Sequence, residues 1–208
     1  MGQALLKLLL DSDAYRDVTV LARRVPPGIA PQPKLQLRTV DFEHLPEPFP
    51  AVDDVYIALG TTIKVAGSQA AFRQIDFDLV VGLARAARSA GATRLAVVSA
   101  LGADVRSRVF YNRVKGDMQA AVGQLGYESV VIAQPSLLIG DRAALGQPLR
   151  SGEVLATRLL GPFMGLVPKG VRPIGANDVA AAMVAATLAA ERGVRILSSG
   201  QMQHAARP

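Results

Sequence analysis

The chain alternates between short apolar runs and longer stretches in which apolar residues recur at helical spacing. A short run of aliphatic and β-branched residues predicts a strand that is buried on both faces. Apolar positions three and four residues apart predict an amphipathic helix. Strands are expected at residues 18–22, 35–40, 55–59, 95–98, 130–133 and 194–197, and helices at 3–10, 68–90, 111–125 and 178–190.

The order of these elements predicts the fold class. Strands that alternate with helices form parallel βαβ units, because a parallel connection needs a crossover of helix length. We therefore expect an α/β fold with a doubly wound, mostly parallel sheet of the Rossmann type. No repeat or linker divides the chain, so residues 1–208 are expected to form a single domain. Residues 141–173 are rich in Gly and Pro and are expected to form a small lobe on the substrate side.

The composition excludes several kinds of functional site and indicates a cellular location. The absence of Cys excludes a thiol nucleophile, a thiolate metal centre and a disulfide framework. Two isolated His residues do not make a metal site, so no metal is expected. The apolar runs are shorter than the roughly 20 residues that span a bilayer, and the first residues lack the features of an export signal. The expectation is therefore a cytoplasmic protein without a membrane partner.

The net charge of +6 first raises the question of a nucleic-acid partner. Residues 142–208 hold eight Lys and Arg against three Asp and Glu, whereas residues 1–141 are almost balanced. A surplus confined to one third of the chain is not the footprint of a nucleic-acid-binding face. The cations of the substrate-side lobe (Arg142, Arg150, Arg158 and Lys169) instead favour an anionic small molecule as substrate.

Polar residues follow several predicted strands at the edge where a doubly wound sheet binds its ligands. Ser99 ends the strand at 95–98, and Tyr111 and Lys115 follow at the start of a helix. Residues four apart lie on one helix face, so the cation lies near the phenol. A nearby cation lowers the pKa of a phenol toward the working range of a proton donor. The Ser hydroxyl can hold the reacting oxygen of a substrate.

These residues stand in motifs that resemble the short-chain dehydrogenase/reductase (SDR) superfamily. The resemblance is to its atypical group, which includes the Tat-interacting-protein-like oxidoreductases. Residues 97–103 read Val-Val-Ser-Ala-Leu-Gly-Ala and residues 110–116 read Phe-Tyr-Asn-Arg-Val-Lys-Gly. Further matching segments are residues 59–62, 66–68, 72–76, 135–140, 173–174 and 178–180. The resemblance covers nearly the whole chain.

The resemblance implies a role for each matching residue. Ser99, Tyr111 and Lys115 would be the catalytic triad, with Tyr111 relaying a proton while hydride moves to or from a nicotinamide and Lys115 also binding its ribose. Leu59, Gly60, Thr61 and Thr62 would pass close to the cofactor, and Pro135, Ser136 and Leu137 would contact the carboxamide end. Asp76 stands where relatives place an Asn, so a fourth catalytic member is not expected.

The family's Gly-x-x-Gly-x-x-Gly phosphate loop is represented only by Gly2, which aligns with its last glycine. The first strand of the sheet and the two earlier glycines have no counterpart. That strand is central and lies between the strands predicted at 18–22 and 55–59. Its loss would leave two rows of unpaired backbone groups, which is costly. We therefore expect the functional gene product to be longer at its amino end.

The remaining expectations concern the cofactor and the class of protein. Arg23 and Arg24 stand where an NAD-specific fold places an acidic residue, so they favour the 2′-phosphate of NADP, with NAD as the other possibility and a solvated Arg pair as the plain alternative. The leading function is an NADP-dependent oxidoreductase acting on a small carbonyl, alcohol or sugar-like molecule. The alternative is a non-catalytic NAD(P)-sensing protein. A homodimer is left open.

Overall fold

The computed structural model describes residues 1–25, 28–42, 44–139 and 170–205. Most of the lobe expected at 141–173, including its four cations, lies outside the described residues. The helices are α1 (Gly2–Asp11), α2 (Ile63–Ala66), α3 (Gln69–Arg73), the π-helical segment η1 (Gln74–Leu79), α4 (Val80–Ser89), α5 (Phe110–Gly123), α7 (Ala176–Leu188) and α8 (Ser199–Ala205). The strands are β1 (Val18–Ala22), β2 (Leu35–Thr39), β3 (Asp54–Ile57), β4 (Arg94–Val98), β5 (Ser129–Gln134), β6 (Leu138–Ile139), β7 (Ile174–Gly175) and β8 (Gly193–Ser198).

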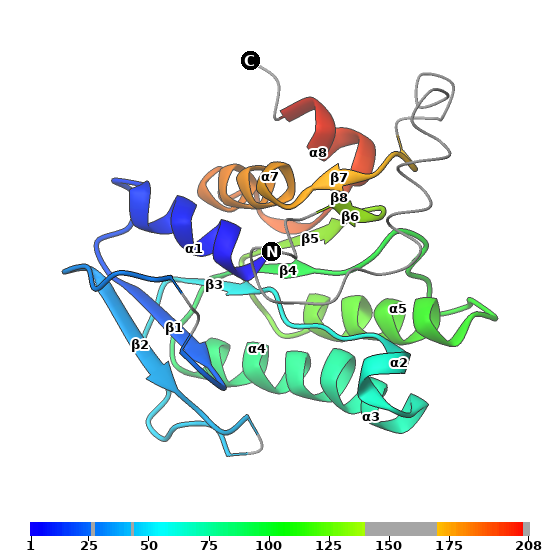
Figure 1. The fold of residues 1–208 in the computed structure, drawn as a ribbon, viewed down its shortest axis with the longest axis horizontal. Coiled ribbons are helices and arrows are strands. Elements are labelled where there is room, and N and C mark those ends of the chain that lie inside the picture. Colours follow the sequence, from blue (N-terminus) through cyan, green and yellow to red (C-terminus); the bar gives the residue numbers. More distant parts are fainter. Residues whose placement is uncertain (26–27, 43, 140–169, 206–208) are drawn as a thin grey trace.

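A parallel sheet of four strands, in the order β3-β4-β5-β8, forms the centre of the molecule (Figure 1). Helices α4 and α5 cover one face, and α1, α7 and α8 cover the other. Strands β4 and β5 are buried almost throughout, as their continuous apolar runs predict. The α/β class and the parallel Rossmann-type sheet expected from the sequence are confirmed. None of the helices in the described ranges is long and apolar enough to cross a membrane.

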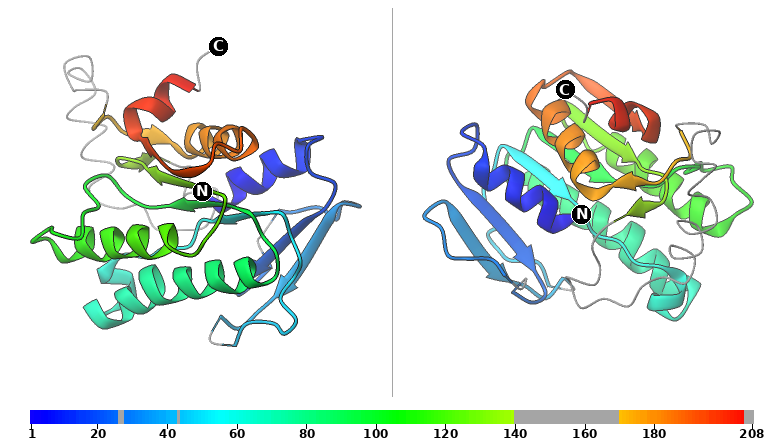
Figure 2. Two further views of the ribbon diagram at one scale, coloured as in Figure 1. Left: turned by 180° about the vertical axis from the view of Figure 1, so that it is seen from behind. Right: turned by 45° about the horizontal axis from the view of Figure 1, so that its top comes forward.

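Strands β1 and β2 pair in parallel with each other and form a separate two-stranded sheet (Figure 2). A cavity of about 1490 Å³ runs between β1 and β3, and residues of both strands line it. The part of this cavity between the two strands is called the slot below. The sequence predicted a missing strand at this place, and the structure shows β1 and β3 unpaired with each other.

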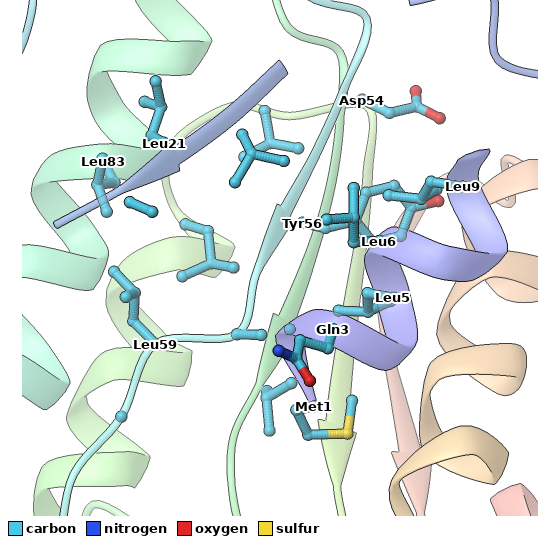
Figure 3. A pocket seen from close by; sticks show the side chains of 18 of the residues that line it. Met1, Gln3, Leu5, Leu6, Leu9, Leu21, Asp54, Tyr56, Leu59 and Leu83 are labelled. Atoms are coloured by element: carbon cyan, nitrogen blue, oxygen red, sulfur yellow. The ribbon is translucent and has the colours of Figure 1, made fainter. Parts of the chain in front are cut away.

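The backbone groups that face the slot follow from the pairing on the other side of each strand. Val18 N–H and Ala22 C=O bond toward β2, so Thr19 and Leu21 direct their backbone groups into the slot. On β3, Asp53 C=O accepts from β4, so the alternate residues Asp54 and Tyr56 face the slot. Apolar side chains of α1 and α4, among them those of Leu6 and Leu83, lie around it (Figure 3).

The helix predicted at 68–90 is observed, but its middle turn is widened. Residues 74–79 form the π-helical segment η1 between α3 and α4, and the helix stops before Gly91, whose φ is +106°. A wider turn projects an extra residue toward the helix's buried side, and such turns are frequent at functional sites. Here Asp76, whose side chain is fully buried, lies in the widened turn.

Candidate active site

Ser99 lies directly after β4, at the carboxyl edge of the sheet. Its backbone N–H continues the ladder to β5 by donating to Ala133 O at 2.7 Å, and the residue is only 5% exposed. A residue held by the ladder on one side and by burial on the other has little freedom. The backbone hydrogen bond and the burial therefore hold Ser99 at the carboxyl edge of the sheet.

Tyr111 and Lys115 come from the first turns of α5, which begins at Phe110. The ring of Tyr111 packs against Phe72, with 5.3 Å between ring centroids, and Phe72 is fully buried. Because Phe72 belongs to α3, this contact positions the phenol from a second helix. The helical spacing predicted from the sequence is observed, and both side chains reach the cavity.

Lys115 is nearly fully buried and is paired with Asp76. Its Nζ lies 2.7 Å from Asp76 Oδ1, and the two residues are 3% and 0% exposed. The second carboxylate oxygen accepts the backbone N–H of Thr61 at 2.9 Å. Among the residues that the structure describes, Oδ1 has no hydrogen-bond partner, and the ammonium group of Lys115 compensates its charge. A buried charge without its partner is costly, so the pair holds Lys115 in place beside the loop after β3.

The Ser99 hydroxyl has a neighbour that the sequence did not reveal. Gln119 Nε2 donates to Ser99 Oγ at 2.6 Å, and Gln119 Oε1 accepts from Gln134 Nε2 at 3.1 Å. Gln119 lies one turn beyond Lys115 on α5, and Gln134 ends β5. The three side chains form a directed chain of hydrogen bonds that ends on Ser99.

The cavity that contains the slot also extends to this site. The sequence-predicted site residues that line it are Gly2, Leu59, Gly60, Thr61, Ser99, Tyr111, Lys115, Pro135, Ser136 and Leu137. Met1 and Gln3 lie at the end of the slot next to Leu59 (Figure 3). One continuous hollow thus joins the start of α1, the ends of β3 and β4, and the start of α5.

Three predicted cofactor residues are not among those that line this cavity. Thr62 instead caps α2, because its Oγ1 accepts the N–H of Val65 at 3.2 Å. Arg23 and Arg24 are exposed at the end of β1 and line a separate hollow of about 400 Å³. Ala22, the last residue of β1, lines the main cavity, but the two arginines that follow it do not.

Two glycines near the site are explained by close packing. A Cβ on Gly60 would lie 3.2 Å from Asp76 Oδ1, so this glycine makes room for the buried carboxylate. A Cβ on Gly116 would lie 2.3 Å from the backbone of Asp104 and Val105, well inside contact distance. Gly116 therefore lets the loop after Ser99 pack directly on α5. Gly60 was expected to lie close to the cofactor, and it lines the cavity as well as leaving room for Asp76.

The segment after β5 is held by a hydroxyl network. Ser136 Oγ donates to Arg172 O and lies 2.9 Å from Ser199 Oγ. This hydroxyl ties the end of β5 to the start of α8. Leu137 is exposed and faces the cavity with Pro135. The Ser136 hydroxyl is thus hydrogen-bonded within the protein, and Pro135 and Leu137 are the neighbouring residues that line the cavity.

A cluster of phenols lies where the slot meets the start of β3. Tyr15 Oη donates to Asp54 Oδ2 at 2.8 Å and lies 2.6 Å from Tyr56 Oη. Burial raises the pKa of Tyr56, and burial together with these hydrogen bonds raises the pKa of Tyr15. Both phenols are therefore neutral at physiological pH.

The residues present fit a nicotinamide dinucleotide in part. The cavity reaches from the slot to the start of α5, and around Ser99 it joins apolar residues to a hydroxyl, a phenol and an ammonium group. At the other end, Gly2 begins α1 and a Cβ there would meet nothing within 4 Å. A helix N-terminus of this kind attracts phosphate through its free N–H groups. Lys115, Tyr111 and the 135–137 segment would hold the nicotinamide end.

Comparison with known proteins identifies the family. FMP52 of Eremothecium gossypii, named a mitochondrial protein, is 31% identical over 97% of this chain and 90% of its own length. The chain belongs to the FMP52 and HTATIP2 family of atypical SDR proteins. HTATIP2 of Rattus norvegicus is 33% identical over 77% of this chain and 66% of its own length. No family model matches the chain.

Solved structures of the same fold bind nicotinamide dinucleotides. MoeE5 in complex with UDP-glucose and NAD has a TM-score of 0.66 and 17% identity, over 94% of this chain and 71% of its own. WbmG of Bordetella bronchiseptica in complex with NAD has a TM-score of 0.67 and 16% identity, over 98% and 71% of the two chains. At this identity the similarity shows the Rossmann-type fold alone.

The comparisons contradict one expectation. A cytoplasmic location was expected from the lack of Cys and of an export signal, but FMP52 proteins of several fungi are named mitochondrial. These names point to mitochondria rather than to the cytoplasm. The expectation was wrong because neither observation bears on mitochondrial import. Arginine-rich transit segments, which do bear on it, are a separate signal from secretory ones.

Sequence analysis missed two residues of the site, Asp76 and Gln119. Asp76 was noted only as a departure from an Asn, since nothing in a sequence indicates that a helix will widen and bury a carboxylate. Gln119 could have been found, because Tyr111, Lys115 and Gln119 follow one another at intervals of four and lie on one face of α5.

Proposed function

We propose that the chain is an NADP-dependent oxidoreductase of the SDR type that acts on a small carbonyl, alcohol or sugar-like substrate. The observation that carries this proposal is the convergence of Ser99, Tyr111 and Lys115 on one cavity. A pure nucleotide sensor has no use for a proton donor, and these three side chains come from two separate elements. The cavity is also suited to a dinucleotide and a small substrate together.

In this proposal the nicotinamide would supply or accept a hydride at the carbonyl carbon. Ser99 would donate its hydroxyl proton in a hydrogen bond to the carbonyl oxygen and hold it beside Tyr111. Tyr111 would give its phenolic proton to that oxygen as the carbonyl becomes an alcohol, and would regain one from solvent. Lys115, one turn away, would stabilise the negative charge left on the phenol.

The preference for NADP is a separate part of the proposal. No acidic residue stands at the end of β1, where it would repel a 2′-phosphate, and Arg23 and Arg24 are exposed there. A guanidinium binds phosphate through two parallel hydrogen bonds. We expect the Arg24→Glu variant to lose affinity for NADPH and keep its affinity for NADH, measured by fluorescence titration.

A non-catalytic NAD(P)-binding protein is the second candidate, and the slot favours it. Because β1 is separated from β3, the two strands do not form a rigid binding site for the pyrophosphate between them. Such a site could still bind a nucleotide weakly, but it would hold the nicotinamide too loosely for efficient turnover. On this candidate the substrate-side residues would serve only to close the cavity over a bound nucleotide.

One experiment separates the two candidates. NADPH binding is measured first, and reduction of a carbonyl panel that includes phenanthrenequinone and para-nitrobenzaldehyde second, with Tyr111→Phe as the variant. We expect Tyr111→Phe to bind NADPH normally and to lose about 100-fold or more in kcat. Tyr127→Phe is the matched control, because Tyr127 donates to Ala84 O away from the cavity. Equal activity of wild type and Tyr111→Phe would refute the mechanism.

A further inference from the structure

The hydrogen bond that Ser99 receives has a defined direction. Gln119 Oε1 accepts from Gln134 at 3.1 Å, so the amide group of Gln119 is oriented with its nitrogen toward Ser99. That nitrogen donates to Ser99 Oγ at 2.6 Å. Within residues 1–25, 28–42, 44–139 and 170–205, no second side-chain partner of the Ser99 hydroxyl is found. Its single proton therefore remains to be donated elsewhere.

We propose that Gln119 is a positioning residue that makes Ser99 a hydrogen-bond donor to the reacting oxygen of the substrate. A hydroxyl has one proton and two lone pairs. Because Gln119 donates to a lone pair, the proton cannot point at Gln119 and is available to an acceptor in the cavity. The site is thereby set for an acceptor oxygen, the carbonyl oxygen of a ketone or aldehyde. This inference rests on the proposed oxidoreductase function.

The positions of the two residues explain why the effect is indirect. Ser99 lines the cavity, whereas Gln119 is not among the described residues that line it. Gln119 belongs to the same face of α5 as Tyr111 and Lys115, one turn further from the helix start. One helix face therefore carries the proton donor, the cation beside it and the residue that orients the serine.

A carboxylate at position 119 would reverse the direction of the hydrogen bond. It can only accept, so it would take the Ser99 proton and turn the hydroxyl away from the substrate. It would also place a negative charge beside the oxygen on which negative charge develops during reduction. Glu has nearly the size and shape of Gln, so the substitution changes the direction and charge while it leaves the packing similar.

The test compares three variants in phenanthrenequinone reduction with NADPH. We expect Gln119→Glu to lower kcat about 10- to 100-fold, and Gln119→Met, which removes the hydrogen bond without adding charge, to lower it less, about 3- to 10-fold. The NADPH dissociation constant is expected to stay within about twofold of wild type in both. Gln124→Glu is the matched control, because Gln124 is exposed at the end of α5 and outside the chain of hydrogen bonds.

A readout that does not need turnover keeps this inference separate from the proposed function. In a double-mutant cycle of Ser99→Ala and Gln119→Met, the shift of the urea midpoint in the combined variant should be smaller than the sum of the single shifts. If wild type reduces no carbonyl, the proposed oxidoreductase function fails, and the cycle still decides whether Gln119 holds Ser99. Additive shifts, or equal kcat values for Gln119→Glu and Gln124→Glu, would overturn the inference.

Discussion

The two halves of this molecule differ in how completely their sheets are paired. Strands β3, β4, β5 and β8 form one ladder in which β4 and β5 are buried, and the proposed catalytic residues stand at its carboxyl edge. This part of the molecule is called the catalytic half below. Strands β1 and β2 pair only with each other within the described residues, and β2 is mostly exposed. The central strands of the catalytic half are thus paired on both sides, whereas the half formed by β1 and β2 meets it across the slot. In the proposed function, proton transfer would therefore depend on the first half and binding of the phosphates on the second.

The first prediction would remove this difference, and it has the largest expected effect. An extended segment of alternating Val residues joined to the amino side of Met1 by a short Gly-containing loop should lie in the slot, parallel to β3. It would pair the backbone groups of Thr19, Leu21, Asp54 and Tyr56. Four or more hydrogen bonds at about 1 kcal/mol each should raise the free energy of unfolding by about 4 kcal/mol, measured by urea denaturation.

The control is a Gly/Ser extension of the same length, which cannot form a stable strand. The alternating segment is also expected to slow amide exchange in β1 and β3 and to tighten NADPH binding, because the paired strands would fix the phosphate end of the cavity. An alternating segment that changes the urea midpoint no more than the Gly/Ser segment would show that the slot does not accept a strand.

The second prediction tests how strongly the catalytic half depends on its buried ion pair. Lys115→Met leaves the fully buried carboxylate of Asp76 without compensation, so the free energy of unfolding should fall by about 3–5 kcal/mol. Adding Asp76→Asn to this variant should recover most of the loss, because an amide carries no charge and can still accept from Thr61 N–H. Urea denaturation of the two single variants and the double variant gives the comparison. A double variant no more stable than Lys115→Met would contradict the role of charge.

The third prediction concerns the close packing that brings the Ser99 loop onto α5. Gly116→Ala would place a Cβ 2.3 Å from the backbone of the loop, so the loop must move. We expect a loss of about 1–3 kcal/mol in stability and a drop in kcat, because Ser99 and Tyr111 flank the displaced loop. Gly123→Ala on the same helix is the control, since a Cβ there meets a Val194 side chain at an ordinary 3.4 Å. Equal effects at the two positions would contradict this account.

The fourth prediction is a pH dependence of the catalytic half. Burial raises the pKa of Tyr127 to about 12, and its hydroxyl donates to Ala84 O at 2.6 Å. A folded-state pKa above the ordinary value near 10 means that stability is intact below about pH 10 and is lost as the pH rises toward 12. The unfolding free energy should therefore fall over this window by roughly 1–3 kcal/mol more in wild type than in Tyr127→Phe. Parallel pH profiles for the two proteins would refute it.

Much of the fold could be predicted because apolar spacing is a local property of the chain. Every strand expected between residues 18 and 198 is observed, and so are the helices around residues 3–10, 111–125 and 178–190. The π-helical turn at residues 74–79 could not be predicted, since its residues also fit an ordinary helix and it differs from one in its wider backbone hydrogen bonding. The pairing of β1 with β2 alone likewise depends on contacts between distant residues.

The sequence by itself determined the strand and helix order and the helical register of Tyr111 and Lys115, because both follow from local periodicity and spacing along the chain. The gap in the sheet was expected from the resemblance to the SDR superfamily. Only the tertiary structure decided which polar groups face one another: Asp76 with Lys115, and Gln119 with Ser99. The physical reason is that a hydrogen bond or ion pair between distant residues depends on distances of a few tenths of an ångström, which packing sets and spacing does not.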